Sequence, residues 1–393
     1  MLFDKKEFIT FHQVSKYDKL NRGRFPAFGQ VYHYHFSSGD KQVTFFYEKG
    51  RFLIKMDKKL LDNKGRPGFG VINDAVDEVN YLDFDLRTSM DKQLPLWRKK
   101  MGFNQFQFIG AMNSRAIFGL AIVNLKLVSN MFVYLYRFDT RQLDEKSLVV
   151  PAALGTHMDQ TPDRGQASFA FPGCHVSISA QEKGEVRKVV GHASPGVEFS
   201  LSLSAAPTFN PLRVCSKAGR NGWVYTQKAA GLDCGGVVNW AGNEMVFDPS
   251  DTRGSYDWSA GFMRRETSWN WACLSGMLPD GRMVGLNLAS GVNETGVTEN
   301  GLWVGNRFQK VNFSCFDFDS CQPDKDWHIY SPDKKVDLTF VPEGMRQEKL
   351  DVLVLASNFR QMFGKYYGYV VRGREKVIID GIPGFAEDHF ARW

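Results

Sequence analysis

The stretch Val197–Ser204, VEFSLSLS, decides the fold class that this sequence predicts. Its apolar residues are Val197, Phe199, Leu201 and Leu203, and each is followed by a glutamate or a serine. Successive side chains of a strand point to opposite faces, so a period of two separates an apolar face from a polar one. The pattern therefore predicts an antiparallel strand with one face buried and the other in solvent.

Many other segments have the length and composition of short strands. Lys41–Tyr47 and Arg51–Met56 are separated by Glu-Lys-Gly, which predicts a hairpin, and Asp280-Gly281 predicts another tight turn. One late helix is expected over Asn358–Phe363, because Gly364 follows it as a C-terminal cap. About twenty strands at this spacing predict an all-β protein of antiparallel barrels or sandwiches with few short helices.

The composition is that of a soluble globular protein. Of 393 residues, 43% are hydrophobic, 23% are charged and 14% are aromatic, and aromatic side chains favour strands and large cores. No apolar run approaches the roughly 20 residues of a membrane helix, and the N-terminus lacks a signal-peptide pattern. The six cysteines include no C-x-x-C pair and are most simply reduced thiols. We therefore expect a cytoplasmic protein.

The length allows two domains, and one segment suggests where they divide. Ala205–Gly222 contains two prolines and two glycines and has no hydrophobic period, so we expect a linker or crossover over residues 205–222. This places an N-terminal β domain at residues 1–204 and a C-terminal β domain at residues 223–393.

Positive charge is concentrated near the N-terminus. Residues 1–66 contain 14 Lys and Arg against 7 Asp and Glu, whereas the net charge of the whole chain is +6. A basic segment of this kind can make peripheral contact with a membrane or hold an acidic ligand, and it can equally be a solvated surface. No nucleic-acid-binding motif accompanies the charge, so nucleic acid is not an expected partner.

The unusual residues gather in one stretch, residues 256–308. Ser268–Cys273, SWNWAC, is expected to be a strand with Trp269 and Trp271 on one face. Two indoles on one side make a broad apolar wall that can bind an apolar ligand or stabilise a cation. The other ligand-binding candidates of this stretch are Trp258, Trp303, Arg264 and Arg265. The alternatives are that the tryptophans belong to the core and that the arginines form salt bridges.

Asp257 is the main catalytic candidate of this stretch. A carboxyl group against the tryptophan wall would lose solvation, retain its proton near neutral pH and act as a general acid. The alternative is that Asp257 caps a turn. Glu294 and Glu299 lie in a glycine-rich loop and are expected to orient water, and as a pair of carboxylates they also suit a glycosidase.

Familiar cofactor and hydrolase signatures are absent from the sequence. It contains no G-x-S-x-G elbow, no P-loop and no H-E-x-x-H motif. Gly68-Phe69-Gly70 lacks the third glycine of a dinucleotide site. We therefore expect neither a cofactor nor a metal site.

Five motifs carry a family resemblance: Tyr225-Thr-Gln-Lys228, Asp257-Trp-Ser-Ala-Gly261, Arg265-Glu-Thr-Ser-Trp269-Asn-Trp271, Glu299-Asn-Gly-Leu-Trp303 and Glu387-Asp-His389. Together they resemble the bacterial domain-of-unknown-function family 2804 over nearly the whole chain. That family is distantly similar to lipocalin-like carotenoid hydratases of the hydroxyneurosporene synthase type. The resemblance implies two consecutive lipocalin-like, calycin-type β domains.

The resemblance also bears on function. Members of the wider group bind or act on hydrophobic molecules, and some protonate a double bond so that water captures the cation. The resemblance matches Asp257 to that acid. We expect a protein that binds a hydrophobic or amphipathic small molecule, with hydratase or isomerase chemistry that needs no cofactor. The alternatives are a lipid carrier that uses the same pocket without chemistry, and a carbohydrate-active protein.

Overall fold

The chain forms two compact units, Met1–Asp57 and Lys58–Trp393. The structure is a computed structural model that describes residues 32–38, 41–48, 51–56, 58–181, 184–292, 296–352 and 355–393. In the first unit, strands β1 (Tyr32–Ser38), β2 (Lys41–Glu48) and β3 (Arg51–Met56) pair antiparallel in that order. Strands β2 and β3 confirm the predicted hairpin.

The second unit begins with a sheet of 14 strands. Its members are β4 (Gly70–Val71), β5 (Asn104–Met112), β6 (Ala116–Asn124), β7 (Val128–Arg137), β8 (Gln142–Pro151), β9 (Thr156–Met158), β10 (Gly165–Phe171), β11 (Cys174–Gln181), β12 (Val186–Ser194), β13 (Val197–Ser204), β14 (Leu212–Ala218), β15 (Gly222–Trp240), β16 (Asn243–Phe247) and β17 (Arg253–Gly261). The main order is β8-β7-β6-β5-β17-β15-β13-β12-β11-β10-β9. Strands β14 and β16 also pair with β15, and β4 pairs with β14.

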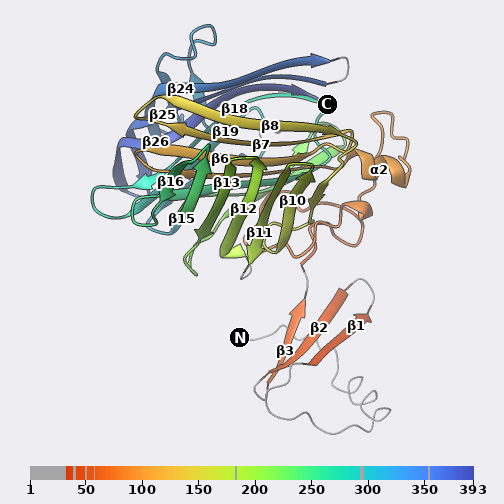
Figure 1. Ribbon diagram of the computed structural model, residues 1–393. Helices are drawn as coiled ribbons and strands as arrows, with labels where there is room; N and C mark the ends of the chain where they lie inside the picture. The colour runs from red at the N-terminus through yellow and green to blue at the C-terminus, as the bar shows by residue number, and fades with distance from the viewer. Residues whose placement is uncertain are drawn as a thin grey trace. The chain divides into compact units, whose positions relative to one another are not determined.

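A second sheet of nine strands completes this unit. Its members are β18 (Glu266–Met277), β19 (Met283–Ser290), β20 (Gly301–Val304), β21 (Arg307–Lys310), β22 (Cys315–Asp317), β23 (Trp327–Tyr330), β24 (Val336–Val352), β25 (Leu355–Arg372) and β26 (Glu375–Arg392). The order is β21-β20-β19-β18-β26-β25-β24-β23-β22. Both sheets are curved, and β24 and β25 lie in a layer beside β7 and β8 (Figure 1). The predicted all-β, antiparallel fold class is confirmed.

Helices are few among the described residues. They are the 3₁₀ helix η1 (Tyr81–Asp83) and the α-helix α2 (Leu96–Gly102). The predicted helix at Asn358–Phe363 is wrong, because these residues lie inside β25 and pair with β24 on one side and β26 on the other. Two full ladders of backbone hydrogen bonds outweigh a local capping signal. In the part of the chain that the structure describes, no helix has the length and apolarity to cross a membrane.

The expected linker contains a strand of the first sheet. Within residues 205–222, β14 pairs with β15 from Leu212↔Lys228 to Ala218↔Gly222. The chain passes from the first sheet to the second at residues 262–265, between β17 and β18. A division of the chain into domains at residues 204 and 223 stays a prediction.

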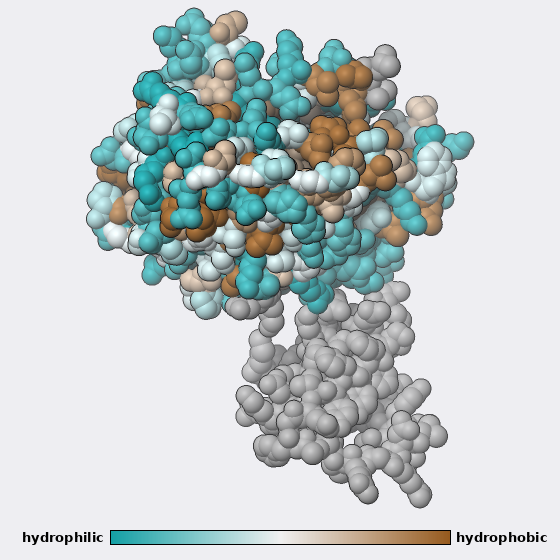
Figure 2. Space-filling view, in the orientation of Figure 1, coloured by the Kyte–Doolittle hydropathy of each residue, from teal (hydrophilic) through white to brown (hydrophobic). Residues whose placement is uncertain are grey.

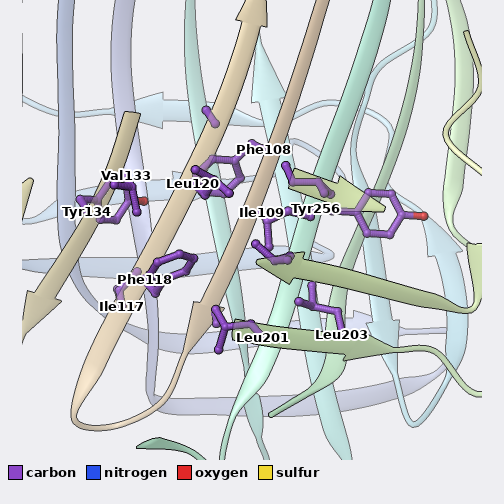
Figure 3. Packing of buried hydrophobic residues seen from close by; sticks show 14 of the residues in the cluster. Phe108, Ile109, Ile117, Phe118, Leu120, Val133, Tyr134, Leu201, Leu203 and Tyr256 are labelled. Atoms are coloured by element: carbon purple, nitrogen blue, oxygen red, sulfur yellow. The ribbon is translucent and has the colours of Figure 1, made fainter. Parts of the chain in front are cut away.

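The alternating stretch that predicts the fold class forms β13. Val197, Phe199, Leu201 and Leu203 are buried, and the residues between them are more exposed. Leu201 and Leu203 pack in the main hydrophobic cluster with Ile109 (Figure 3). Complete burial of such a side chain stabilises the fold by about 1.5–3 kcal/mol. The alternation therefore predicts the strand correctly, and its apolar face joins the core.

Aromatic side chains connect the two sheets. Phe108 on β5 packs edge-on against Trp271 on β18 and Phe385 on β26, with ring centroids 5.4 Å and 5.7 Å away. Tyr134 on β7 packs against Phe363 on β25 at 5.1 Å. These contacts hold the sheets face to face, and a cavity lies among the same strands.

Candidate functional site

A cavity of about 300 Å³ lies between the two sheets. Strands β5, β7, β15 and β17 line it from the first sheet, and β18, β24, β25 and β26 line it from the second. Its aromatic lining residues are Phe106, Phe108, Phe132, Trp269, Trp271, Phe359 and Trp393. The volume is at the lower end of the range of small-molecule sites, and the aromatic and aliphatic lining residues suit the apolar part of a ligand.

Three charged side chains meet inside this cavity. Lys228 on β15 stands opposite Asp257 on β17 in the register of the sheet. Lys228 Nζ lies 2.6 Å from Asp257 Oδ2 and 3.0 Å from Glu299 Oε2. Glu299 comes from the loop that precedes β20. The exposed fractions of the three side chains are 5%, 7% and 3%, so this is a buried ion cluster with two carboxyl groups and one ammonium group.

The pKa of Lys228 reflects its surroundings. Burial alone would lower the pKa of this amine, because a charged ammonium loses solvation. The charges of Asp257 and Glu299, and the hydrogen bonds to them, outweigh burial and raise the pKa above its usual value. Lys228 is therefore a lasting cation within this cavity.

Hydroxyl groups hold the other oxygen of Asp257. Ser259 Oγ donates to Asp257 Oδ1 at 2.9 Å, and Thr226 Oγ1 lies 3.2 Å from the same oxygen. The two hydroxyls are 2.6 Å apart. Thr226 and Ser259 are register partners two residues along their strands from Lys228 and Asp257, on the same face, so the local pairing fixes the whole group.

Trp271 and Asn287 position the rest of the cluster. Trp271 Nε1 donates to Asn287 Oδ1 at 2.7 Å, and Asn287 Nδ2 donates to the backbone oxygen of Glu299 at 2.7 Å. Lys228 Nζ also lies 5.1 Å from the centre of the Trp271 ring, within the range of a cation–π interaction. The indole therefore contacts the ammonium directly and anchors the loop that carries Glu299.

A second lysine lies close to the Glu299 loop. Lys310 Nζ donates to Thr298 Oγ1 at 2.6 Å and to the backbone oxygen of Val311. No carboxylate forms an ion pair with it within residues 296–352 or the other described ranges. Burial lowers the pKa of Lys310 to about 8, against a smaller opposing effect of the Glu299 charge.

Another polar group lines the same cavity from β25 and β26. Trp269 Nε1 donates to Glu387 Oε1 at 3.0 Å, and Gln361 Nε2 donates to Glu387 Oε2 at 3.3 Å. His389 Nδ1 lies 3.5 Å from Glu387 Oε1, and its Nε2 lies 3.1 Å from Ser357 Oγ. Glu387 and His389 are two residues apart on β26, so both face the cavity.

The structure brings only some of the predicted site residues into the cavity. Asp257, Glu299, Trp269, Trp271 and Arg264 line it. Arg264 is held there by Nη2, which donates to the backbone oxygen of Gly291 at 2.8 Å. Glu294 lies outside the described residues.

The remaining candidates lie elsewhere. Trp258 points to the opposite face of β17 and packs against Tyr225 in a separate buried cluster. Trp303 is fully buried, and its Nε1 donates to the backbone oxygen of Asn210 at 2.8 Å. Arg265 is exposed. These three side chains are not part of the cavity lining.

Sequence reasoning missed Lys228, Gln361 and the Glu387–His389 group as site residues. The available signal was a lysine inside the apolar strand segment Gly222–Trp240, since a charge at such a position is costly unless it is paired. Lys228 pairs with Asp257 and Glu299, which are 29 and 71 residues away in the sequence. No group of three or more His, Cys, Asp or Glu side chains suited to a metal ion occurs within the described ranges.

The fold and cavity first define a class: an antiparallel β protein whose two packed sheets enclose a cavity with a buried ion cluster. The family follows from the sequence. Residues 52–393 match the model described as Domain of unknown function (DUF2804), so the chain belongs to that family. This confirms the resemblance in the sequence motifs. No curated protein matches the chain.

Solved structures with the same fold are distant in sequence. The structure of CghA has a TM-score of 0.52 at 11% identity and covers 85% of this chain and 96% of that chain. CghA with Sch210972 gives 0.53 at 11% identity, with 86% and 97% covered. Kievitone hydratase from Nectria haematococca gives 0.41 at 11% identity, with 72% and 88% covered. At this identity the similarity to the two CghA structures shows the fold alone.

Proposed function

We propose that the protein binds an apolar or amphipathic small molecule in the cavity and transfers a proton at one of its carbon atoms, as a hydratase or isomerase that needs no cofactor. The observation that carries the proposal is the buried Lys228–Asp257–Glu299 cluster in a cavity that aromatic and aliphatic side chains also line. Burying three charged groups costs free energy. A protein that only stored an apolar ligand would need the wall without the charges.

The proposed role of Asp257 is that of a base. The sequence predicts a general acid, but Lys228 and Ser259 both donate hydrogen bonds to the oxygens of this carboxyl group, so these oxygens serve as acceptors. An ammonium group has three N–H donors, and Lys228 directs two of them at Asp257 and Glu299. The third donor is then available to an oxygen atom of a ligand in the cavity.

The substrate class that suits this arrangement is a conjugated carbonyl compound with an apolar skeleton. In isomerisation, Asp257 takes a proton from a carbon near the carbonyl group, and the electron pair of the C–H bond moves through the conjugated system onto the carbonyl oxygen. The Lys228 ammonium stabilises the resulting oxyanion. Asp257 then returns the proton to another carbon of the same system, so the product has the same atoms as the substrate.

Hydration uses the same groups. Asp257 takes a proton from a water molecule as the water oxygen adds to the conjugated C=C bond, and the displaced electron pair moves onto the carbonyl oxygen beside Lys228. The proton then passes from Asp257 to the adjacent carbon. The product contains one added water, and Asp257 is a carboxylate again.

The placement of the tryptophans gives the carbohydrate alternative less support. Sugar platforms require exposed indole faces, whereas Trp258 and Trp303 are buried away from the cavity. The carrier alternative shares the cavity with our proposal, so chemistry on the bound molecule separates the two.

Identification of the bound molecule followed by a turnover assay tests the proposal. Native mass spectrometry of the purified full chain, with extraction of the ligand, supplies the molecule for incubation with wild type and with Asp257→Asn. We expect wild type to form an isomer or a hydrate. Loss of the base should slow this conversion by roughly 100- to 10,000-fold.

The matched control is Asp380→Asn, which removes an exposed carboxylate of β26. This variant should convert the ligand like wild type. If wild type returns the extracted molecule and its conjugated carbonyl analogues unchanged, the carrier alternative holds and the proposal is wrong.

A further inference from the structure

Helix α2 and the residues before it carry exposed apolar and basic side chains. Trp97 is 61% exposed and Leu96 is 55% exposed, and Met101 on the same helix is also exposed. The basic residues of this segment are Lys92, Arg98, Lys99 and Lys100, and residues 92–104 contain no Asp or Glu. A soluble protein seldom exposes a tryptophan beside leucine and methionine without a binding partner.

Part of the cavity lining lies at the same end of the first sheet, since Asn104, Val128 and Val149 line the cavity. Helix α2 ends at Gly102, and β5 begins two residues later, where Gln105 pairs with Asn124 at the end of β6. The register continues through Asn124↔Ser129 and Val128↔Pro151 to the end of β8. The turns at these strand ends therefore lie at the same end of the sheet as α2.

These turns and the hairpin of β24 and β25 add further apolar surface. Their exposed residues are Leu127, Val149, Leu154, Leu350 and Val352. Val149 and Leu350 also line the cavity, so the apolar surface continues into it. Hydrophobic residues gather on the right of the larger unit in Figure 2, on the side where Figure 1 places α2 and the C-terminus.

We infer that this end of the molecule, named here the α2 face and comprising α2 with Lys92, Leu127, Val149 and Val352, docks on the surface of an anionic membrane. A tryptophan and aliphatic side chains enter the boundary between headgroups and acyl chains. The basic side chains contact the anionic headgroups, and their aliphatic stems lie along the apolar atoms. Arg98 already lies over the Trp97 ring at 5.1 Å, which keeps charge and indole side by side.

Charge and shape favour a membrane over a protein partner. A run with four basic and no acidic residues is complementary to a uniformly negative surface. The apolar residues come from separate turns and a short helix, so they offer several shallow insertions rather than a groove for one peptide. If the proposed function holds, an apolar substrate would pass from the lipid to the cavity without crossing water.

Sedimentation with lipid vesicles tests this docking surface in the full chain. We expect binding to vesicles of phosphatidylcholine and phosphatidylserine, weaker binding to phosphatidylcholine alone, and loss of most binding at high salt. Lys92→Glu/Lys100→Glu, which reverses two exposed charges, should weaken binding to the anionic vesicles by roughly tenfold or more. Leu96→Ser/Trp97→Ser should also weaken it, and this loss should persist at low salt.

Matched controls use exposed residues outside the α2 face. Lys188→Glu/Lys325→Glu reverses the same number of charges, and Ile378→Ser removes an exposed apolar side chain. Both control variants should bind vesicles to the same extent as wild type. Lys228→Met should also bind vesicles like wild type. The vesicle experiment therefore tests the docking surface whether or not the proposed function is right.

Two results would overturn the inference. One is an absence of sedimentation with phosphatidylserine vesicles at low salt. The other is equal weakening by the α2-face variants and the matched controls, with circular dichroism showing that all of the proteins are folded.

Discussion

Two lysines close to Glu299 have opposite pKa shifts. Lys228 is buried between Asp257 and Glu299, and these carboxylates raise its pKa despite burial. Lys310 is half-buried and donates to a hydroxyl and a backbone oxygen, and burial lowers its pKa to about 8. Burial acts in the same direction on both amines, so the difference comes from the charge of their partners.

The comparison shows which site is built to retain charge. The cluster around Lys228 keeps an ammonium group beside the cavity at any physiological pH, which is what stabilisation of an oxyanion requires. Burial instead makes the Lys310 ammonium easier to deprotonate, with a pKa of about 8.

Lys228→Met should give the largest change in stability. The substitution removes the cation that Asp257 and Glu299 share. Their side chains are only 7% and 3% exposed, so two buried carboxyl groups lose their partner. Removal of one partner from a buried ion pair costs about 3–5 kcal/mol, so the free energy of unfolding at neutral pH should fall by about that amount. Urea denaturation of wild type and the variant measures the difference.

The control for this substitution removes the carboxylates as well. Lys228→Met/Asp257→Asn/Glu299→Gln leaves no unpaired charge in the cluster, and it should recover most of the lost stability. A single Lys228→Met variant as stable as wild type would contradict a cluster held together by charge.

Lys310 should give a smaller effect that depends on pH. Its pKa is about 8 in the folded protein and 10.5 by the reference value, so between these values the unfolded chain binds more protons. Stability from this group therefore rises with pH from about 8 to 10, by about 2 kcal/mol. The pH dependence of stability that comes from Lys228 has the opposite sign. Its stabilising contribution is present below the pKa of the unfolded chain and is lost only as the pH rises through the raised pKa of the folded protein.

Lys310→Met isolates the pH effect. Relative to the variant, wild type should gain stability as the pH increases through this window, and urea midpoints at pH 7, 8, 9 and about 10 would show the slope. Equal slopes of stability against pH for wild type and Lys310→Met would show that Lys310 keeps its charge in the folded state through this window. The pKa values of Lys310 and Lys228 would then not be shifted in opposite directions.

Trp271→Phe should give the smallest effect. Phenylalanine keeps a ring under Lys228 but loses the hydrogen bond from Nε1 to Asn287 and part of the cation–π attraction. We expect a loss of about 1 kcal/mol in the free energy of unfolding. In a Lys228→Met background the loss should be smaller, because only the hydrogen bond is then removed. An unchanged loss in that background would show that Trp271 and Lys228 do not interact.

The sequence predicts most of the fold because strand patterning is local. Each apolar residue of Val197–Ser204 is buried in β13 as the alternation requires. The helix expected at Asn358–Phe363 fails for the opposite reason, since its state is decided by partners on β24 and β26 that local capping signals do not include. The same long-range pairing places a strand, β14, in the segment expected to be a linker.

The site is less accessible to sequence reasoning. Asp257 and Glu299 are identifiable as acids in a tryptophan-rich stretch, and Trp269 and Trp271 share a face as expected. Lys228 joins them only through the register of β15 and β17, and Glu387 joins through the pairing of β18 with β26. Trp258 fails as a cavity residue because it follows Asp257 directly and must point to the other face of β17.

The central claim is that Asp257 and Lys228 move a proton at a carbon of the cavity ligand. Deuterium incorporation tests it most directly: the extracted ligand is incubated with wild type in D₂O and analysed by mass spectrometry and NMR. We predict deuterium at a carbon conjugated to the carbonyl group with wild type and with Asp380→Asn, and none above background with Asp257→Asn or Lys228→Met. Ligand recovered from wild type without carbon-bound deuterium, or labelled equally by the Asp257→Asn variant, would contradict the account.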